Sequence, residues 1–261
     1  MTDYDPAYDG AYGDFSATLS YSSYLKLDAV LTAQHPLSDA HDEMLFIIQH
    51  QTSELWLKLA IHELTCARSA LLQGTYDPAF KMLARVARIF EQLNTAWDVL
   101  RTMTPSDYTE FRKTLGKSSG FQSAQYRKVE FILGNRNTKM LRPFSHIPDM
   151  SKWFEDELEQ PSLYDVALLC LERDGLDITS PRQAWLGVYA APQTHWSHYQ
   201  LAEKLVDLED YMRRWRFNHV TTVERIIGAK TGTRGTSGVA YLKKMLDIVM
   251  FPDLWDIRSE M

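Results

Sequence analysis

Phe46 and His50 are the first pair of residues whose types and spacing could do chemistry. They lie four positions apart in a stretch of helical periodicity, so both side chains should project from one face of the same helix. That face is otherwise apolar, and a histidine there needs a hydrogen-bond partner or a cavity. The spacing leaves two interpretations open: a histidine satisfied within the core, or one that belongs to a binding site.

Tyr108 and Arg112 form a second such pair, again one helical turn apart. A phenol aligned with a guanidinium could bind a carboxylate, because arginine presents its donors as a planar fork. The other interpretation is an exposed arginine that pairs with Glu110 or another acid. Spacing does not decide between the two.

His219 and the loop from Gly232 to Gly238 are a third candidate. The loop reads GTRGTSG, and glycine and hydroxyl residues at this density can present backbone N–H groups to an anion. The loop could equally be a flexible linker between helices. A lone histidine can be an axial ligand of haem iron, but its spacing does not show this role.

Two common catalytic signatures are absent from the sequence, which has no HExxH or CxxC motif, and it has no calcium-binding loop. Residues 116–118 (Gly-Lys-Ser) look like the end of a phosphate-binding loop, but Phe111 stands where the first glycine belongs, so we discard that interpretation. His195, His198 and Glu203 have a helical spacing that could touch a metal ion. A polar stripe on a long helix is the favoured interpretation of these three residues.

Helical periodicity covers most of the chain, and no window shows sustained alternation of apolar and polar residues. The predicted helices cover residues 41–72, 78–103, a short stretch from 105, 121–133, a stretch from 163 that stops at Gly175, 192–228 and 239–249. Residues 135–161 have little periodicity and contain prolines, which indicates a long, partly ordered connection. We therefore predict an all-α fold, with residues 1–20 as a flexible segment and residues 21–261 as a single bundle of long antiparallel helices.

Composition excludes several classes of partner. A formal charge of −6 and a pI near 5.8 provide no extended basic surface, so we expect no nucleic-acid partner. Cys66 and Cys170 are too few for a disulfide framework, which suits a reducing cytosol. The acidic first thirty residues do not resemble a secretory signal, and no apolar run is long enough to span a bilayer. We expect a cytoplasmic protein without a membrane partner.

The segment HDEMLFIIQHQTSELWLKL, residues 41–59, resembles the most distinctive stretch of the tryptophan 2,3-dioxygenase family. The resemblance continues in the same order through residues 21–34, 103–135, 161–165, 194–228, 232–246 and the FPDLWDIR segment near the end. It covers nearly the whole chain, roughly residues 20 to 258. It implies an all-α domain that encloses a haem b pocket.

The resemblance also implies a role for each candidate residue. His219 falls where the family has its axial haem ligand, and His50 matches the distal histidine that accepts a hydrogen bond from the indole N–H. Phe46 would line the indole pocket, and Tyr108 and Arg112 match the pair that holds the substrate carboxylate.

Further positions match residues around the substrate. Thr233 falls where the family binds the ammonium and carboxylate groups, and Leu115 and Ser119 match residues near the haem and the substrate. Tyr21 and Tyr24 match N-terminal tyrosines that close the pocket of a neighbouring subunit. The implied assembly is a homotetramer.

The implied reaction inserts both atoms of O₂ across the indole C2–C3 bond of L-tryptophan, or of a close analogue, on ferrous haem b and gives N-formyl-L-kynurenine. Arg234 departs from the family pattern, because it stands where the loop usually has a second glycine. One alternative is therefore a haem monooxygenase of the same superfamily that adds a single oxygen to tryptophan or a methylated tryptophan. A second alternative is a non-catalytic haem-binding sensor or carrier.

Overall fold

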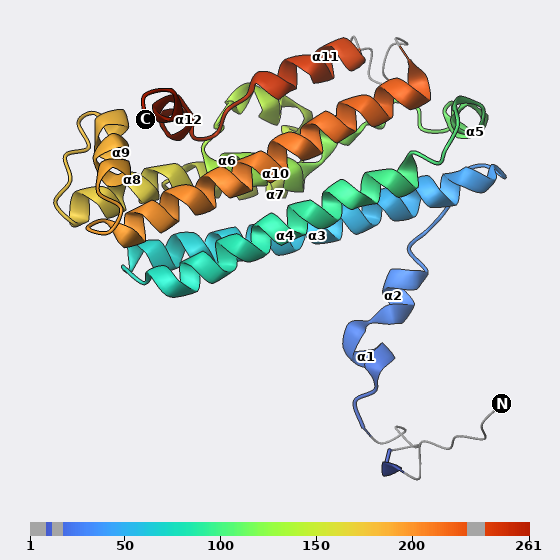
Figure 1. Ribbon diagram of the computed structural model, residues 1–261. Helices are drawn as coiled ribbons and strands as arrows, with labels where there is room; N and C mark the ends of the chain where they lie inside the picture. The colour runs from blue at the N-terminus through green and yellow to red at the C-terminus, as the bar shows by residue number, and fades with distance from the viewer. Residues whose placement is uncertain (1–8, 12–17, 229–237) are drawn as a thin grey trace.

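Three long helices form the body of the molecule: α3 (His41–Leu72), α4 (Tyr76–Leu100) and α10 (Trp196–Ile227) (Figure 1). The structure is a computed structural model that describes residues 9–11, 18–228 and 238–261. Within these ranges it contains helices and no strand, so the predicted all-α class is confirmed. None of these helices is long and apolar enough to cross a membrane.

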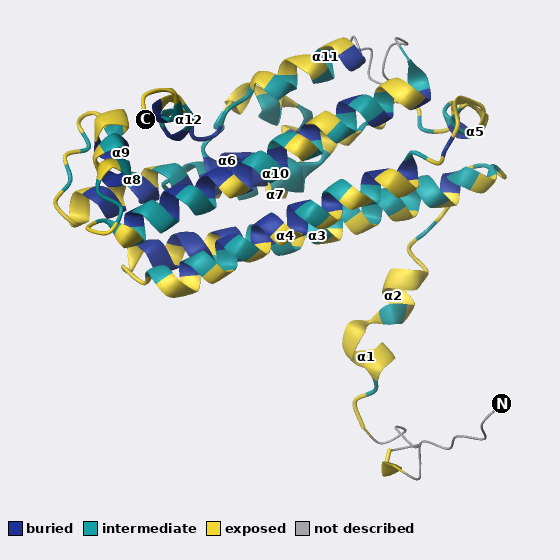
Figure 2. Ribbon diagram, viewed as in Figure 1, coloured by how far each residue is buried: buried dark blue, intermediate teal, exposed yellow. Residues whose placement is uncertain are grey.

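The relative direction of the long helices follows from their side-chain contacts. A turn at Gly74, which has a φ of 78°, reverses the chain, so α3 and α4 run antiparallel as predicted. In contrast, α4 and α10 run parallel. Asn94 contacts Asn218 and Arg101 contacts Thr222, so the two partners are separated by nearly the same number of positions, 124 and 121, in both contacts. Figure 2 shows buried residues where these helices face one another.

The helix α3 has the bounds that its periodicity predicts. Its N-cap is Ala40, which forms no side-chain capping hydrogen bond. Ser38 donates its hydroxyl to Glu43, whose carboxylate also accepts hydrogen bonds from two backbone N–H groups before the helix. These bonds lower the pKa of Glu43, and the charged carboxylate stabilises the helix start.

Shorter helices connect and cover the long ones. They are α5 (Pro105–Phe111), α6 (Ala124–Leu133), α7 (Pro148–Leu158), α8 (Leu163–Arg173), α9 (Pro181–Ala190), α11 (Val239–Lys244) and α12 (Pro252–Asp256), with 3₁₀ turns η2 (Gly120–Gln122), η3 (Thr138–Phe144), η4 (Met245–Asp247) and η5 (Ile257–Ser259). Capping boxes begin α5 at Thr104 and α8 at Ser162, as the sequence indicates. The last predicted helix is shorter than expected and continues as η4, and α9 and α12 were not predicted.

The prediction of a partly ordered connection over residues 135–161 is wrong, because η3 and α7 fill it. Phe144 and Phe154 from this segment are buried against Phe131 of α6. Arg136 binds the end of α7 by donating to the carbonyl oxygens of Leu158, at 3.1 Å, and Gln160, at 2.5 Å.

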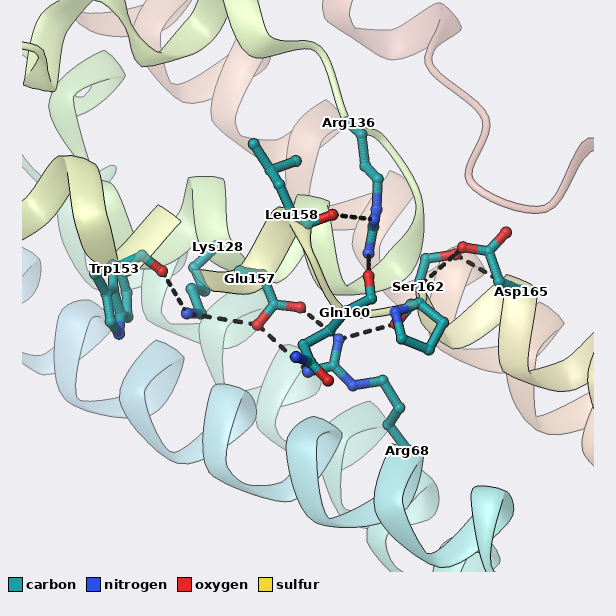
Figure 3. Close-up of polar contacts among 10 residues, drawn as sticks. Arg68, Lys128, Arg136, Trp153, Glu157, Leu158, Gln160, Ser162 and Asp165 are labelled. Atoms are coloured by element: carbon teal, nitrogen blue, oxygen red, sulfur yellow. Dashed lines mark hydrogen bonds and ion pairs between the residues drawn. The ribbon is translucent and has the colours of Figure 1, made fainter. Parts of the chain in front are cut away.

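A buried ion cluster joins α7 to α3 and α6 (Figure 3). The Glu157 carboxylate pairs with Arg68 of α3 and with Lys128 of α6, and all three side chains are less than a tenth exposed. Lys128 Nζ also donates to the Trp153 carbonyl at 2.9 Å, and Arg68 donates to the Pro161 carbonyl at 3.1 Å. These contacts satisfy the buried charges and order the segment.

An N-terminal arm stands away from the helical body (Figure 1). It consists of α1 (Tyr21–Leu25) and α2 (Leu27–Leu31), and neither helix has a buried residue. Most of residues 1–20 lie outside the described ranges, so their predicted flexibility and the predicted domain limits stay predictions.

Candidate functional site

A second apolar cluster lies where the N-terminal half of α3, the end of α4, α5 and the end of α10 meet. Its buried members are Trp97, Leu100, Met103, Phe111 and Ile226. Phe46, Tyr108 and Leu115 are half-buried and pack against it, so the structure brings these three predicted site residues together.

His50 has a defined orientation next to this cluster. Its Nδ1 lies 2.7 Å from the carbonyl oxygen of Phe46. A carbonyl oxygen only accepts hydrogen bonds, so Nδ1 carries the proton of the neutral ring and Nε2 remains an acceptor. Burial lowers the pKa of His50, which keeps the ring neutral. The Phe46 and His50 ring centroids are 4.1 Å apart.

Tyr108 and Arg112 lie one turn apart at the end of α5, as predicted. The guanidinium carbon of Arg112 is 6.0 Å from the centre of the Tyr108 ring, which itself lies 6.1 Å from the Phe46 ring. Burial raises the pKa of Tyr108, so its phenol stays protonated and can donate. A cation and a hydroxyl donor therefore border the same aromatic surface, an arrangement that suits an aromatic molecule with a carboxylate.

His219 approaches the cluster from α10. Its ring stacks on Trp97 with centroids 5.0 Å apart and planes at 13°, and it also contacts Trp215 at 5.6 Å. Burial, and to a smaller extent the proximity of His50, lower its pKa to about 4. At neutral pH the imidazole therefore has a free lone pair in apolar surroundings, which is the form that binds a metal.

The family follows from comparison with known proteins. The family model described as tryptophan 2,3-dioxygenase matches residues 7–179 and 180–261, which is nearly the whole chain. The chain belongs to this family. The resemblance inferred from the sequence is thus confirmed.

Individual relatives agree with the family model. A tryptophan 2,3-dioxygenase of Bradyrhizobium diazoefficiens is 60% identical over 274 aligned positions, which cover 99% of this chain and 98% of the relative. A tryptophan 2,3-dioxygenase of Ruegeria pomeroyi is 57% identical, with 99% of both chains covered. One from Burkholderia pseudomallei is 56% identical, with 94% of this chain and 86% of the relative covered.

Ser119 and Thr233 are the remaining positions near the substrate that the family resemblance predicts. Ser119 caps η2 by accepting from the Phe121 backbone N–H at 3.4 Å. The rings of Phe121 and Tyr241 lie 5.8 Å apart, so the start of α11 lies beside η2. Thr233 and Arg234 fall outside the described residues, and their roles stay predictions.

Tyr21 and Tyr24 are not part of the site within one chain. Both lie on the arm, 76% and 71% exposed, and α1 has no buried residue. Their predicted role in a neighbouring subunit is not tested by a single chain.

The possible metal-binding stripe on α10 has other partners. His198 Nε2 lies 2.9 Å from the Asp174 carboxylate and 3.2 Å from the Tyr76 hydroxyl, whereas Glu203 pairs with Arg258 at 2.9 Å. In the described parts of the chain, no cluster of three or more His, Cys, Asp or Glu side chains could hold a metal ion.

Proposed function

We propose that this chain catalyses the oxidative cleavage of the indole C2–C3 bond of L-tryptophan by O₂, which gives N-formyl-L-kynurenine, with haem b bound through His219. One observation carries the proposal: two neutral imidazoles, His50 and His219, border the same apolar cluster beside Arg112, in a chain about 60% identical to proteins named tryptophan 2,3-dioxygenase.

The residues around His219 fit a porphyrin. The imidazole is neutral, and its ring contacts two indoles, those of Trp97 and Trp215, so its surroundings are apolar, as the macrocycle requires. The indole Nε1 of Trp97 is buried without a hydrogen-bond partner among the described residues, which is consistent with a further group in this region. When bound, ferrous haem supplies the redox chemistry that makes O₂ reactive toward the indole carbons.

The protein's own residues orient the substrate. The Nε2 of His50 accepts the hydrogen bond of the indole N–H, and Phe46 covers the indole ring. Arg112 binds the carboxylate through two charge-assisted hydrogen bonds, with Tyr108 as a further donor. Thr233 binds the ammonium and carboxylate groups from the loop before α11. Buried aromatic and aliphatic side chains exclude water from the reacting atoms.

A homotetramer completes the site in this proposal, with Tyr21 and Tyr24 supplied by a neighbouring subunit. The arm exposes Leu19, Tyr21, Tyr24, Leu25, Val30 and Leu31, an apolar surface that a second chain would cover. The residues after α2 are joined to α3 by a hydrogen bond from Gln34 Nε2 to Gln51 Oε1, at 2.6 Å, and Gln51 follows His50 in the chain. Light scattering that gives the mass of a single chain would contradict this assembly.

The two cysteines are free thiols, which suits a reducing compartment such as the cytoplasm.

Turnover in a cuvette tests the proposed function. Reduced, haem-loaded protein is mixed with air-saturated buffer and L-tryptophan, and near-ultraviolet absorption of N-formyl-L-kynurenine is expected to increase steadily. The His219→Ala variant is expected to lose both haem retention and product formation. Haem bands without product would instead support a sensor or carrier.

A further inference from the structure

The plane of the His219 ring depends on the groups that contact the ring. Rotation of an imidazole about its last side-chain torsion is soft. A histidine that binds a metal is usually held by a hydrogen bond from its second ring nitrogen to a carboxylate, carbonyl or water. No residue in the described part of the chain forms such a bond with His219, whose nearest characterised contacts are two indoles.

The two indoles restrain the ring differently. Trp97 lies nearly parallel to the imidazole, at 13° and 5.0 Å, whereas Trp215 is tilted by 37° at 5.6 Å. Trp97 and Trp215 are themselves only 5.6 Å apart, so the three rings form a triangle rather than a sandwich. Trp97 thus covers one face of the imidazole, and these two indoles leave the other face and the ring edge available to a ligand.

Trp97 is held by packing in the second apolar cluster, where its side chain is 8% exposed. Its Nε1 is buried and has no partner among the described residues. The position of the Trp97 ring therefore depends on the packing of its apolar surface.

Hydrogen bonds between α4 and α10, here called the polar seam, lie on both sides of the contact between Trp97 and His219. One turn before Trp97, Asn94 Oδ1 accepts from Asn218 Nδ2 at 2.9 Å. One turn after it, Arg101 Nε donates to the Thr222 hydroxyl at 2.8 Å, and its Nη2 donates to the Asn218 carbonyl at 3.3 Å. The seam thus brackets His219 on both sides and prevents rotation of α10 about its axis.

From this geometry we propose that Trp97 is a positioning residue for the axial ligand: its indole face sets the plane of the His219 imidazole, and the Arg101 seam keeps α10 in the rotation that preserves the stack. The inference rests on the proposed function, because it assigns an orientation to the imidazole that would bind haem.

The test uses Trp97→Leu, which removes the flat face, and Trp97→Phe, which keeps a face without the N–H. The iron–imidazole stretching band is measured by resonance Raman spectroscopy on the ferrous, substrate-free holoprotein, and haem transfer to apomyoglobin is timed. For Trp97→Leu the band is expected to shift and broaden, with haem release faster on the order of ten-fold. Trp97→Phe is expected to restore both, and Arg101→Met to broaden the band.

Leu93→Ala is the matched control. Leu93 lies one turn before Trp97 on α4, is 1% exposed and packs in the first, larger apolar cluster of the protein rather than in the second. It is expected to lower stability without moving the band. A wild-type band and wild-type haem release in Trp97→Leu would overturn the inference, as would equal disruption in Trp97→Phe and Trp97→Leu.

A second measurement applies if Trp97→Leu does not fold. The ring protons of His219 in cofactor-free wild-type protein are expected to show upfield NMR shifts from the indole face, and unshifted protons would overturn the inference. His219→Gly separates the two proposals. If this variant keeps the band, the assignment of the ligand fails. If it loses the band while Trp97→Leu keeps it, only the positioning role fails.

Discussion

His50 donates from Nδ1 to the carbonyl oxygen of Phe46, which lies 2.7 Å away and one turn earlier on α3. The bond fixes both the orientation and the tautomer of the ring, because the carbonyl can only accept. Nε2 is therefore presented as an acceptor at the apolar cluster. An indole N–H is a donor of matching polarity, so we propose that His50 recognises the indole N–H of the substrate.

Removal of that acceptor is expected to matter only for substrates that have an indole N–H. His50→Ala is expected to lower kcat/KM for L-tryptophan about ten-fold, because that change corresponds to the free energy of one buried hydrogen bond. The matched control is 1-methyl-L-tryptophan, which has no N–H to donate and should show little difference between the two proteins. Equal losses with both substrates in steady-state assays would contradict the assigned role.

The pH profile should reflect the lowered pKa of His50. The ordinary histidine pKa is about 6.5, and burial lowers that of His50, so the neutral acceptor persists below this pH. Between the two pKa values the unfolded chain binds more protons than the folded one, so acidification reduces the free energy of unfolding while His50 in the folded protein stays neutral. We expect kcat/KM to stay constant as the pH falls to about 6.5 and to decrease only below it. An inflection above that pH would contradict the expectation.

Arg112 is expected to act on the carboxylate of the substrate. Arg112→Leu should raise KM for L-tryptophan by roughly one to two powers of ten, since a bidentate charge-assisted contact contributes about 1.5–3 kcal/mol. Tryptamine, which lacks the carboxylate, provides the control in a binding titration. Its affinity should change little, and a comparable loss for tryptamine would show that the substitution disrupts the site as a whole.

The buried ion cluster should dominate the stability of the segment around α7. Glu157→Ala leaves Arg68 and Lys128 buried without their carboxylate and is expected to reduce the free energy of unfolding by about 3–5 kcal/mol. Asp156→Ala is the control, because Asp156 is 57% exposed and forms its ion pair with the exposed Lys152, so a change below about 1 kcal/mol is expected. Denaturant titrations measure both, and similar changes in the two variants would contradict this account.

Local sequence signals predict the local parts of the fold. The predicted range of α3, residues 41–72, is confirmed, and the capping boxes at Thr104 and Ser162 mark the starts of α5 and α8. The one-turn spacing of Phe46 and His50 likewise predicts their shared face. Each of these features depends on residues three or four positions apart, which the sequence displays directly.

Long-range contacts account for what the sequence does not predict. The order of residues 135–161 depends on the pairing of Glu157 with Arg68, 89 positions away. The sequence pattern places Trp97 on the apolar face of a helix but does not predict its contact with His219. That contact forms only when α4 and α10 pack in parallel. Periodicity gives the faces of helices but not the partners of those faces.

The mass of the product formed under labelled oxygen tests the proposed reaction most directly. Haem-loaded, reduced protein is supplied with L-tryptophan and ¹⁸O₂, and the product is analysed by mass spectrometry before exchange with water. The account predicts N-formyl-L-kynurenine that carries two labelled oxygen atoms. A product with one labelled atom, or no product from a haem-loaded protein, would contradict the assignment of a dioxygenase.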